Sequence, residues 1–182
     1  MSEEKKVRGL LTIENTRIIF KNFAGKKTEY NEEGNRNFGV LLNDDDAERL
    51  SADGWNVKYL RAREDDPDGY RQPWLQVKVR FDNFPPNVYI VKGGDGDGSL
   101  RKIKLDENTV GQLDWANIES VDIQISPYNY PARSGRPAGV SAYLKTLYVM
   151  IKEDDLEAKY GSIPEAEDFQ DIEIGDEELP FN

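Results

Sequence analysis

The sequence contains no cysteine and no histidine among its 182 residues. Without cysteine the chain can form no disulfide, thiol nucleophile or thiolate zinc site. Without histidine it lacks the side chain most often used for proton transfer near neutral pH. A catalyst built on this chain would depend on carboxylates, Lys, Tyr or Ser, so the composition favours a binding protein. A carboxylate site for Mg²⁺ stays open, but we expect no metal and no cofactor.

Long apolar runs are missing as well. No run of about 18 apolar residues is present, and the chain does not open with a charged segment followed by an apolar one. We therefore expect neither a membrane span nor a secretory leader, and we place the protein in the cytoplasm. The length is typical of one folded domain with a real core.

The negative charge is confined to one end of the sequence. The formal net charge is −11, and residues 153–182 hold 12 acidic side chains and 1 basic one. The remaining residues hold 23 acidic and 23 basic side chains, so this part is neutral. We predict a folded body, residues 1–152, followed by a flexible acidic tail, residues 153–182.

The body has the period-two alternation and the β-branched and aromatic content of strands. Strands are predicted at Leu10–Phe20, Phe38–Leu42, Val57–Arg63, Trp74–Phe81, Val88–Val91, Ile118–Ser126 and Tyr143–Ile151. Short helices are predicted within residues 43–54 and 106–115, because each segment begins with a polar N-cap residue and has acidic side chains in its first turn. Loops are predicted at Asn22–Asn37, Asp65–Pro73 and Pro127–Gly139, with a turn at Gly93–Ser99. The pattern predicts a mainly β protein, a small antiparallel barrel with helical connections.

The strand Trp74–Phe81 is the most informative segment. Side chains alternate across a strand, so its apolar residues share one face, while Trp74, Gln76, Lys78 and Arg80 share the other. An aromatic ring among cations is typical of a single-strand platform, where a base stacks on the ring and the cations follow the phosphates. The alternative is an ordinary solvated face with one amphipathic Trp.

Two further segments combine rings with cations. In Val57–Arg63, Tyr59, Arg61 and Arg63 have the same parity, so they could face the same groove. The loop Pro127–Gly139 contains Tyr128, Tyr130, Arg133 and Arg136, which suit a clamp on a guest strand. For the first segment, the alternative is that Tyr59 lies at the barrel rim and that Arg61 and Arg63 pair with the acids at 64–66. For the loop, the alternative is that Tyr128 or Tyr130 covers a barrel end.

The sequence also contains weaker signals for other classes of function. Asp68, Gln76 and Lys78 loosely resemble the arrangement of a family of metal-dependent nucleases, but Gln76 replaces an expected acidic ligand. Asp95, Asp97 and Ser99 suggest a Ca²⁺ loop, yet the closing bidentate acid is missing and a hairpin turn fits better. An acidic DNA mimic would need acids spread over the folded surface, whereas the body is neutral.

The chain resembles phage single-stranded DNA-binding proteins with an oligonucleotide-binding (OB) barrel. The segment Ser126–Ile151, which ends in a strand beginning Ala-Tyr-Leu-Lys-Thr, is most similar to a stretch of these proteins. The resemblance implies an OB-fold-like barrel that binds single-stranded DNA without sequence preference and does no covalent chemistry. The DNA contacts then expected are Tyr59, Arg61, Arg63, Trp74, Lys78, Arg80, Tyr128, Tyr130, Arg133 and Arg136, with Tyr143 and Lys145.

The tail has a resemblance of its own. Family members end in an acidic stretch finished by an aromatic residue, and "DEELPF", which comprises Asp176, Glu177, Glu178, Leu179, Pro180 and Phe181, is similar to it. This implies docking on replication and recombination proteins in a phage-infected host cell. Asn182 follows the Phe, so we expect the Phe181 side chain, rather than a terminal carboxylate, to enter the partner's pocket. Whether the protein is a homodimer stays open.

The acidic tail also predicts self-competition, because polyanionic residues 153–182 can compete with DNA for the basic groove of the body. Deleting them should tighten binding of single-stranded DNA severalfold at low salt, and the gain should shrink as salt screens the charges. Titration of labelled oligo-dT with the full chain and with residues 1–152 checks this. Equal affinities at low salt would end the competitor role.

Overall fold

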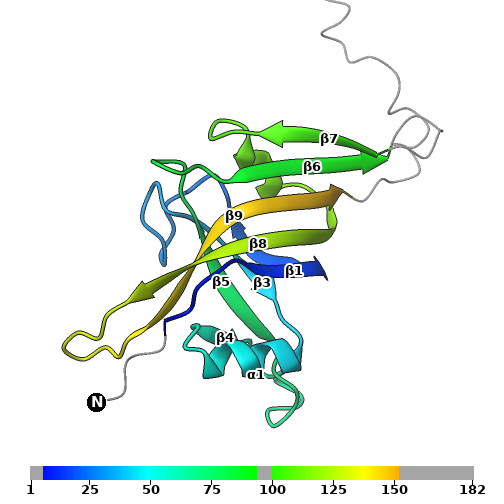
Figure 1. Cartoon of the computed structure of the whole chain (residues 1–182). Coiled ribbons are helices and arrows are strands. Elements are labelled where there is room, and N and C mark those ends of the chain that lie inside the picture. Colours follow the sequence, from blue (N-terminus) through cyan, green and yellow to red (C-terminus); the bar gives the residue numbers. More distant parts are fainter. Residues whose placement is uncertain (1–5, 94–99, 152–182) are drawn as a thin grey trace, which may run out of the picture. The chain divides into compact units, whose positions relative to one another are not determined.

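The computed structural model describes residues 6–93 and 100–151. Nine strands, one α-helix and one 3-10 helix are assigned in this part of the chain (Figure 1). The strands are β1 (Leu11–Thr16), β2 (Ile18–Asn22), β3 (Arg36–Leu41), β4 (Val57–Tyr59), β5 (Pro73–Val79), β6 (Asn87–Gly93), β7 (Leu100–Leu105), β8 (Ile118–Tyr130) and β9 (Gly139–Ile151). The helices are α1 (Asp44–Ala52) and the 3-10 helix η1 (Val110–Asp114).

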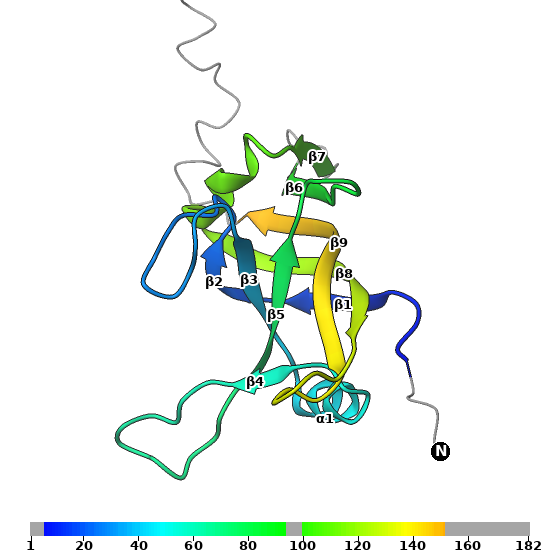
Figure 2. The same cartoon turned by 90° about the vertical axis from the view of Figure 1, so that its left-hand side faces the viewer.

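The strands form one curved sheet with the order β1-β8-β9-β5-β3-β2. Along this path every pairing is antiparallel except that of β5 with β9, which is parallel. The two ends of the path, β1 and β2, do not pair in the described ladders but follow each other in the chain, separated by Arg17. The chain itself therefore joins the ends of an otherwise open barrel (Figure 2). The predicted mainly β, OB-fold-like class is confirmed, although hydrogen bonding does not close the sheet.

A two-stranded ribbon extends the sheet beyond this path. β6 pairs with β9 in parallel and with β7 in antiparallel, so β7, β6, β9, β8 and β1 lie side by side in Figure 1. β7 was not predicted, because its sequence, "LRKIKL", lacks strict alternation and five of its six residues are exposed. The expected turn at Gly93–Ser99 falls almost entirely outside the described residues.

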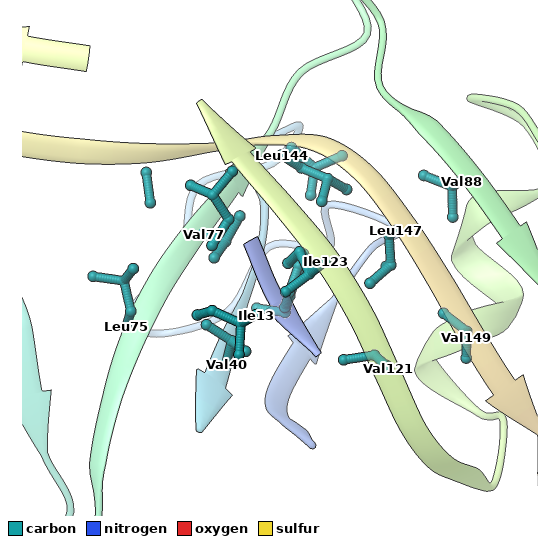
Figure 3. Packing of buried hydrophobic residues seen from close by; sticks show 14 of the residues in the cluster. Ile13, Val40, Leu75, Val77, Val88, Val121, Ile123, Leu144, Leu147 and Val149 are labelled. Atoms are coloured by element: carbon teal, nitrogen blue, oxygen red, sulfur yellow. The ribbon is translucent and has the colours of Figure 1, made fainter. Parts of the chain in front are cut away.

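The core lies inside the curve of the sheet and draws on nearly every strand (Figure 3). Val40, Val77 and Ile123 come from different strands and are fully or almost fully buried. Phe23 and Phe38 stack with their ring centroids 4.8 Å apart. Among the described residues no buried side chain is polar or charged, so the free energy of folding depends on apolar burial and close packing.

The helix α1 begins with a side-chain cap, whereas η1 has none. In α1 the Asn43 side chain accepts a hydrogen bond from the Asp46 backbone N–H, as predicted for this segment. Before η1, Asp106 accepts hydrogen bonds from Thr109, which lower the pKa of its carboxyl group. The Asp114 carboxylate at the end of η1 accepts from the backbone N–H groups of Phe23 and Ala24 at 2.7 and 3.1 Å. These contacts fix the start of the first long loop.

Three predicted strand boundaries are wrong. The strand expected at Val57–Arg63 ends at Tyr59, and the segment expected at Leu10–Phe20 breaks at Arg17 into β1 and β2. The loop expected at Pro127–Gly139 is largely a hairpin, because β8 continues to Tyr130 and β9 begins at Gly139. Its tight turn is closed by reciprocal backbone hydrogen bonds between Arg133 and Arg136.

A β-bulge in β9 interrupts the alternation of inward and outward residues along this strand. Gln124 and Ile125 of β8 are neighbours, but their partners in β9 are Thr146 and Leu144, so Lys145 is an extra residue. The bulge lets Leu144 and Leu147 both face the core although they are three residues apart. Lys145 itself is exposed.

No helix in the described part of the chain is long and apolar enough to span a membrane. The predicted acidic tail, residues 153–182, lies outside the described residues, so its boundary and flexibility stay predictions.

The stacked pair of phenylalanines should be critical for stability. Phe38→Ala is expected to lower the free energy of unfolding by about 3–5 kcal/mol, because it opens a cavity next to Phe23. Phe84→Ala is the matched control, since Phe84 is 89% exposed and its removal should change stability by less than about 0.5 kcal/mol. Urea denaturation of both variants measures the difference, and similar losses would contradict this description of the core.

Candidate nucleic-acid interface

The outward face of β5 carries the predicted platform. Leu75, Val77 and Val79 are buried, while Trp74 and Gln76 are half-buried and Lys78 is exposed. The alternation predicted for this strand is therefore confirmed. One side of β5 belongs to the core, and the other presents a ring, an amide and an ammonium group to the outside.

Trp74 is held in place by neighbours on three strands. Its ring packs against Gly39 of β3, where a Cβ atom would meet the Trp74 ring at 2.6 Å. Phe20 of β2 contacts it edge-on, with the ring centroids 5.1 Å apart. Lys58 of β4 places its Nζ atom 5.3 Å from the centroid of the Trp74 ring and donates a hydrogen bond of 3.3 Å to Gln76. The result is an aromatic pair of exposed Phe20 and half-buried Trp74 next to a cation.

The parallel pairing of β5 with β9 continues this face. Lys78 lies opposite Tyr143, and the Lys78 Nζ atom is 5.7 Å from the centroid of the Tyr143 ring. Tyr128 of β8 meets Tyr143 edge-on at 6.0 Å and is 55% exposed. Three tightly linked strands thus present a further cation and two more rings on the same side of the sheet.

The β8–β9 hairpin carries the face beyond the barrel (Figure 1). Tyr130 lies over Gly139, where there is no room for a Cβ atom, and the Arg136 guanidinium is 3.9 Å from the centroid of its ring. The other side of the hairpin is anchored: Asn129 exchanges two hydrogen bonds of 2.9 Å with the backbone of Val7, and the Val140 N–H donates to the Gly54 carbonyl. These hydrogen bonds on the opposite side of the hairpin hold the strands that carry Tyr130 and its Arg136 partner in place.

A groove of about 610 Å³ runs between this face and the first long loop. Gln76, Lys78 and Tyr143 line one side of it, and Arg80 lies at the end of β5. The Arg80 guanidinium pairs with Asp82 at 3.5 Å, but both side chains are about 60% exposed, so a phosphate could replace the carboxylate at small cost. The groove also contains Asn37, which lies opposite Lys78 on β3.

The structure brings together six of the predicted DNA contacts. Trp74, Lys78, Tyr128, Tyr130, Arg136 and Tyr143 share the outward face, which we call the aromatic–basic face together with Lys58 and Phe20. Arg80 joins it through the groove. Lys145 is exposed at the bulge further along β9. That any of these side chains contacts DNA stays a prediction.

Four predicted contacts lie elsewhere. Tyr59 has the parity of Val57, which lies opposite buried Leu75, so it belongs to the other side of β4 and lines a hollow next to α1. Arg61 and Arg63 follow the end of β4 and therefore do not share a strand face with Tyr59. The Arg63 guanidinium pairs with Asp65 at 3.0 Å, the alternative considered for it. Arg133 lies in the hairpin turn, bonded through its backbone to Arg136.

Two side chains of the aromatic–basic face were missed. Lys58 belongs to the predicted strand but has the opposite parity to the one chosen, and only its register with Trp74 reveals its position. Phe20 has a backbone φ of 51°, so simple alternation does not describe its direction. Parity separates Lys58 from Val57 but does not tell which of the two faces outward, and for Phe20 the sequence carried no signal.

The nuclease alternative finds no support in the geometry. Asp68 lies in the loop between β4 and β5, while Gln76 and Lys78 lie on the outward face. Within residues 6–93 and 100–151 no three carboxylates gather at a possible metal site. Asp95, Asp97 and Ser99 of the considered Ca²⁺ loop lie outside the described residues.

Residues 1–180 match the family model of the phage ssDNA-binding domain. The chain belongs to this family. The prediction of a binding protein rather than an enzyme is confirmed by this membership, and so is the resemblance on which that prediction was based. No curated protein matches the chain.

Solved structures of phage proteins are similar at low identity. The single-stranded DNA-binding protein from bacteriophage Enc34 is 12% identical, with 88% of this chain and 89% of that chain covered and a TM-score of 0.44. The same protein in complex with ssDNA is 13% identical, with coverages of 81% and 88% and a TM-score of 0.44. A single-stranded DNA-binding protein encoded by bacteriophage T7 is 11% identical, with coverages of 87% and 96% and a TM-score of 0.35.

Proposed function

We propose that the protein binds single-stranded DNA along the aromatic–basic face, with the strand in the groove beside β5. The observation that carries this proposal is the alternation of rings and cations across adjacent strands: Trp74 with Lys58, Tyr143 with Lys78, and Tyr130 with Arg136. Each ring can stack on a base, and each neighbouring cation can approach the phosphate that follows it.

The chemistry of this face favours binding that tolerates any sequence. Every base has a π-face, so stacking on Trp74 or Tyr128 does not depend on base identity. Lysine and arginine contacts to phosphate carry no sequence information. Membership of a phage ssDNA-binding family supports the same ligand. The face is wide because it spans β2, β3, β5, β9 and β8, and this width suits an extended strand better than a single nucleotide.

Single substitutions on β5 should separate stacking from charge. Trp74→Ala is expected to weaken binding of oligo-dT by about 1–3 kcal/mol, because one base loses its stacking partner. Lys78→Gln should lower the slope of log K against log salt by about 0.7, the value for one lost phosphate contact on a single strand. Fluorescence anisotropy of labelled oligo-dT over a salt series measures both effects.

Matched controls are available outside the aromatic–basic face. Trp115 is 80% exposed and follows η1, outside the aromatic–basic face, so Trp115→Ala removes an equally large ring elsewhere. Arg49 lies on α1, and Arg49→Gln removes a positive charge there. If Trp115→Ala and Arg49→Gln weakened binding as much as the β5 variants, the assignment of the strand to this face would be wrong.

We also propose that the acidic tail recruits replication or recombination proteins in the infected host cell. The support is compositional: six residues, Asp176–Phe181, combine three acids with Leu-Pro-Phe. Such a segment suits an apolar pocket ringed by Lys or Arg, with the acids steering it to the pocket.

The tail tip can be tested apart from DNA binding. Replacing Leu179 and Phe181 with Ala should abolish retention of purified phage or host replication proteins on the immobilised full-length protein, since the apolar anchor is lost. Affinity for oligo-dT should stay unchanged, because the acids are kept. Equal retention of these proteins by both forms would remove the recruitment role and leave the DNA-binding proposal intact.

A further inference from the structure

A second ring–cation cluster lies on the outward side of the β6–β7 ribbon. Tyr89 of β6 and Tyr148 of β9 are paired in register and stack with their ring centroids 5.1 Å apart and an interplanar angle of 14°. The Lys102 Nζ atom of β7 lies 4.8 Å from the centroid of the Tyr89 ring. We call these three residues, with Lys104, the ribbon cluster. None of them belongs to the aromatic–basic face described above.

The ribbon cluster is positively charged on its β7 side. Lys104 lies opposite Tyr89 and Lys102 opposite Val91, so both share the outward side of the ribbon, and both are exposed. No ion pair within the described residues involves either ammonium group. On the other side Asp122 of β8 lies opposite Tyr148, and its carboxylate accepts a hydrogen bond of 2.7 Å from the Asn15 N–H. An anion is therefore favoured over β6 and β7 rather than over β8.

β9 connects the ribbon cluster with the aromatic–basic face. Tyr143 belongs to that face and Tyr148 to the cluster, and five residues of extended strand span about 16 Å. Because the bulge at Lys145 shifts the alternation by one residue, both tyrosines face outward although one is odd-numbered and the other even. Exposed Lys145 lies between them. Rings and cations thus follow one another along a single strand.

We propose that the ribbon cluster is a second stacking site for the same DNA strand, reached along β9 past Lys145. This inference rests on the proposed function, because it extends the path of the strand bound beside β5. The Tyr148 or Tyr89 ring stacks on a base, and Lys102, Lys104 and Lys145 contact the phosphates on the way. Oligonucleotides too short to leave the groove do not reach the cluster.

A purely structural role makes a different prediction. Stacked rings on neighbouring strands stabilise a sheet by themselves, and then the tyrosines would matter for unfolding but the lysines would not matter for DNA. Two exposed lysines on the outward side therefore distinguish the two roles, since neutralising them leaves the stacked tyrosines in place.

The test compares oligo-dT of two lengths, about 6 and about 16 nucleotides, the range of site sizes on one OB fold. In the double variant Lys102→Gln and Lys104→Gln, the salt slope for the long oligonucleotide should fall by about 1.4, two phosphate contacts, and the slope for the short one should not change. Tyr148→Leu should weaken binding of the long oligonucleotide about tenfold and leave binding of the short one unchanged. Thermal unfolding reports whether each variant is folded.

The matched control lies on the same ribbon. Lys92 and Arg101 face each other across β6 and β7 with the parity of the buried residues Ile90 and Leu105, so they belong to the other side. Lys92→Gln with Arg101→Gln removes the same charge and should leave the length dependence intact. The second site would be overturned if the double variant of Lys102 and Lys104 had the wild-type salt slope on the long oligonucleotide. It would also be overturned if the variant changed the oligomeric state of the DNA-free protein, as measured by sedimentation.

The aromatic–basic face is tested separately. Trp74→Ala weakens binding of both oligonucleotides if the proposed function holds, whatever the ribbon cluster does. If the wild-type protein bound neither oligonucleotide, or if Trp74→Ala weakened binding of neither, the proposed function and the second site would be rejected together. An effect of Trp74→Ala without an effect of the ribbon-cluster variants would reject the second site alone.

Discussion

The arrangement of the whole outer surface depends on the short parallel pairing between β5 and β9. It joins Val77 to Ala142 in the core layer and Lys78 to Tyr143 on the outside. Without it, the strands β2 to β5 and the strands β8 and β9 would each keep their own rings and cations, with no common face. Parallel strands need a long connection, and here this connection contains the β6–β7 ribbon, η1 and β8.

The same strand serves both the interior and the surface, and this limits what can change in it. Each inward residue of β5 packs in a core that contains no buried polar group among the described residues, so apolar side chains are required there. Each outward residue is positioned by a neighbour: Trp74 by the absence of a side chain at Gly39, and Gln76 by Lys58. Packing therefore holds the outward side chains of β5 in position before any ligand binds, and their position does not depend on loops alone.

The accuracy of the sequence predictions differed between elements for physical reasons. β5 was predicted well because β3 pairs with it on one side and β4 and β9 pair with it on the other, so one face is buried throughout and the alternation is clean. β4 was predicted too long, because Arg71 donates hydrogen bonds to the carbonyls of Tyr59 and Leu60 and thereby replaces a ladder partner. This contact between distant residues has no local signal.

Faces were harder to predict than strands. Parity orders the residues within a strand but does not tell which set faces inward, and Tyr59 was assigned to the wrong side because an aromatic residue suits either. The register with buried Leu75 decides the question, and register comes from the tertiary structure. The aromatic–basic composition of the β8–β9 hairpin was correctly recognised, whereas its extended conformation was not, because Pro and Gly indicated a loop.

The bulge in β9 accommodates one extra residue without changing the faces of the strand. Without Lys145, Leu144 would stay opposite Ile125 and Thr146 opposite Gln124, so the pairing would become regular. Leu147 and Val149 would keep their partners in β8 and stay buried. A residue lost at a regular position of β9 would instead reverse the faces of the residues that follow it. Homologues should therefore differ in length at the bulge more often than elsewhere in this strand.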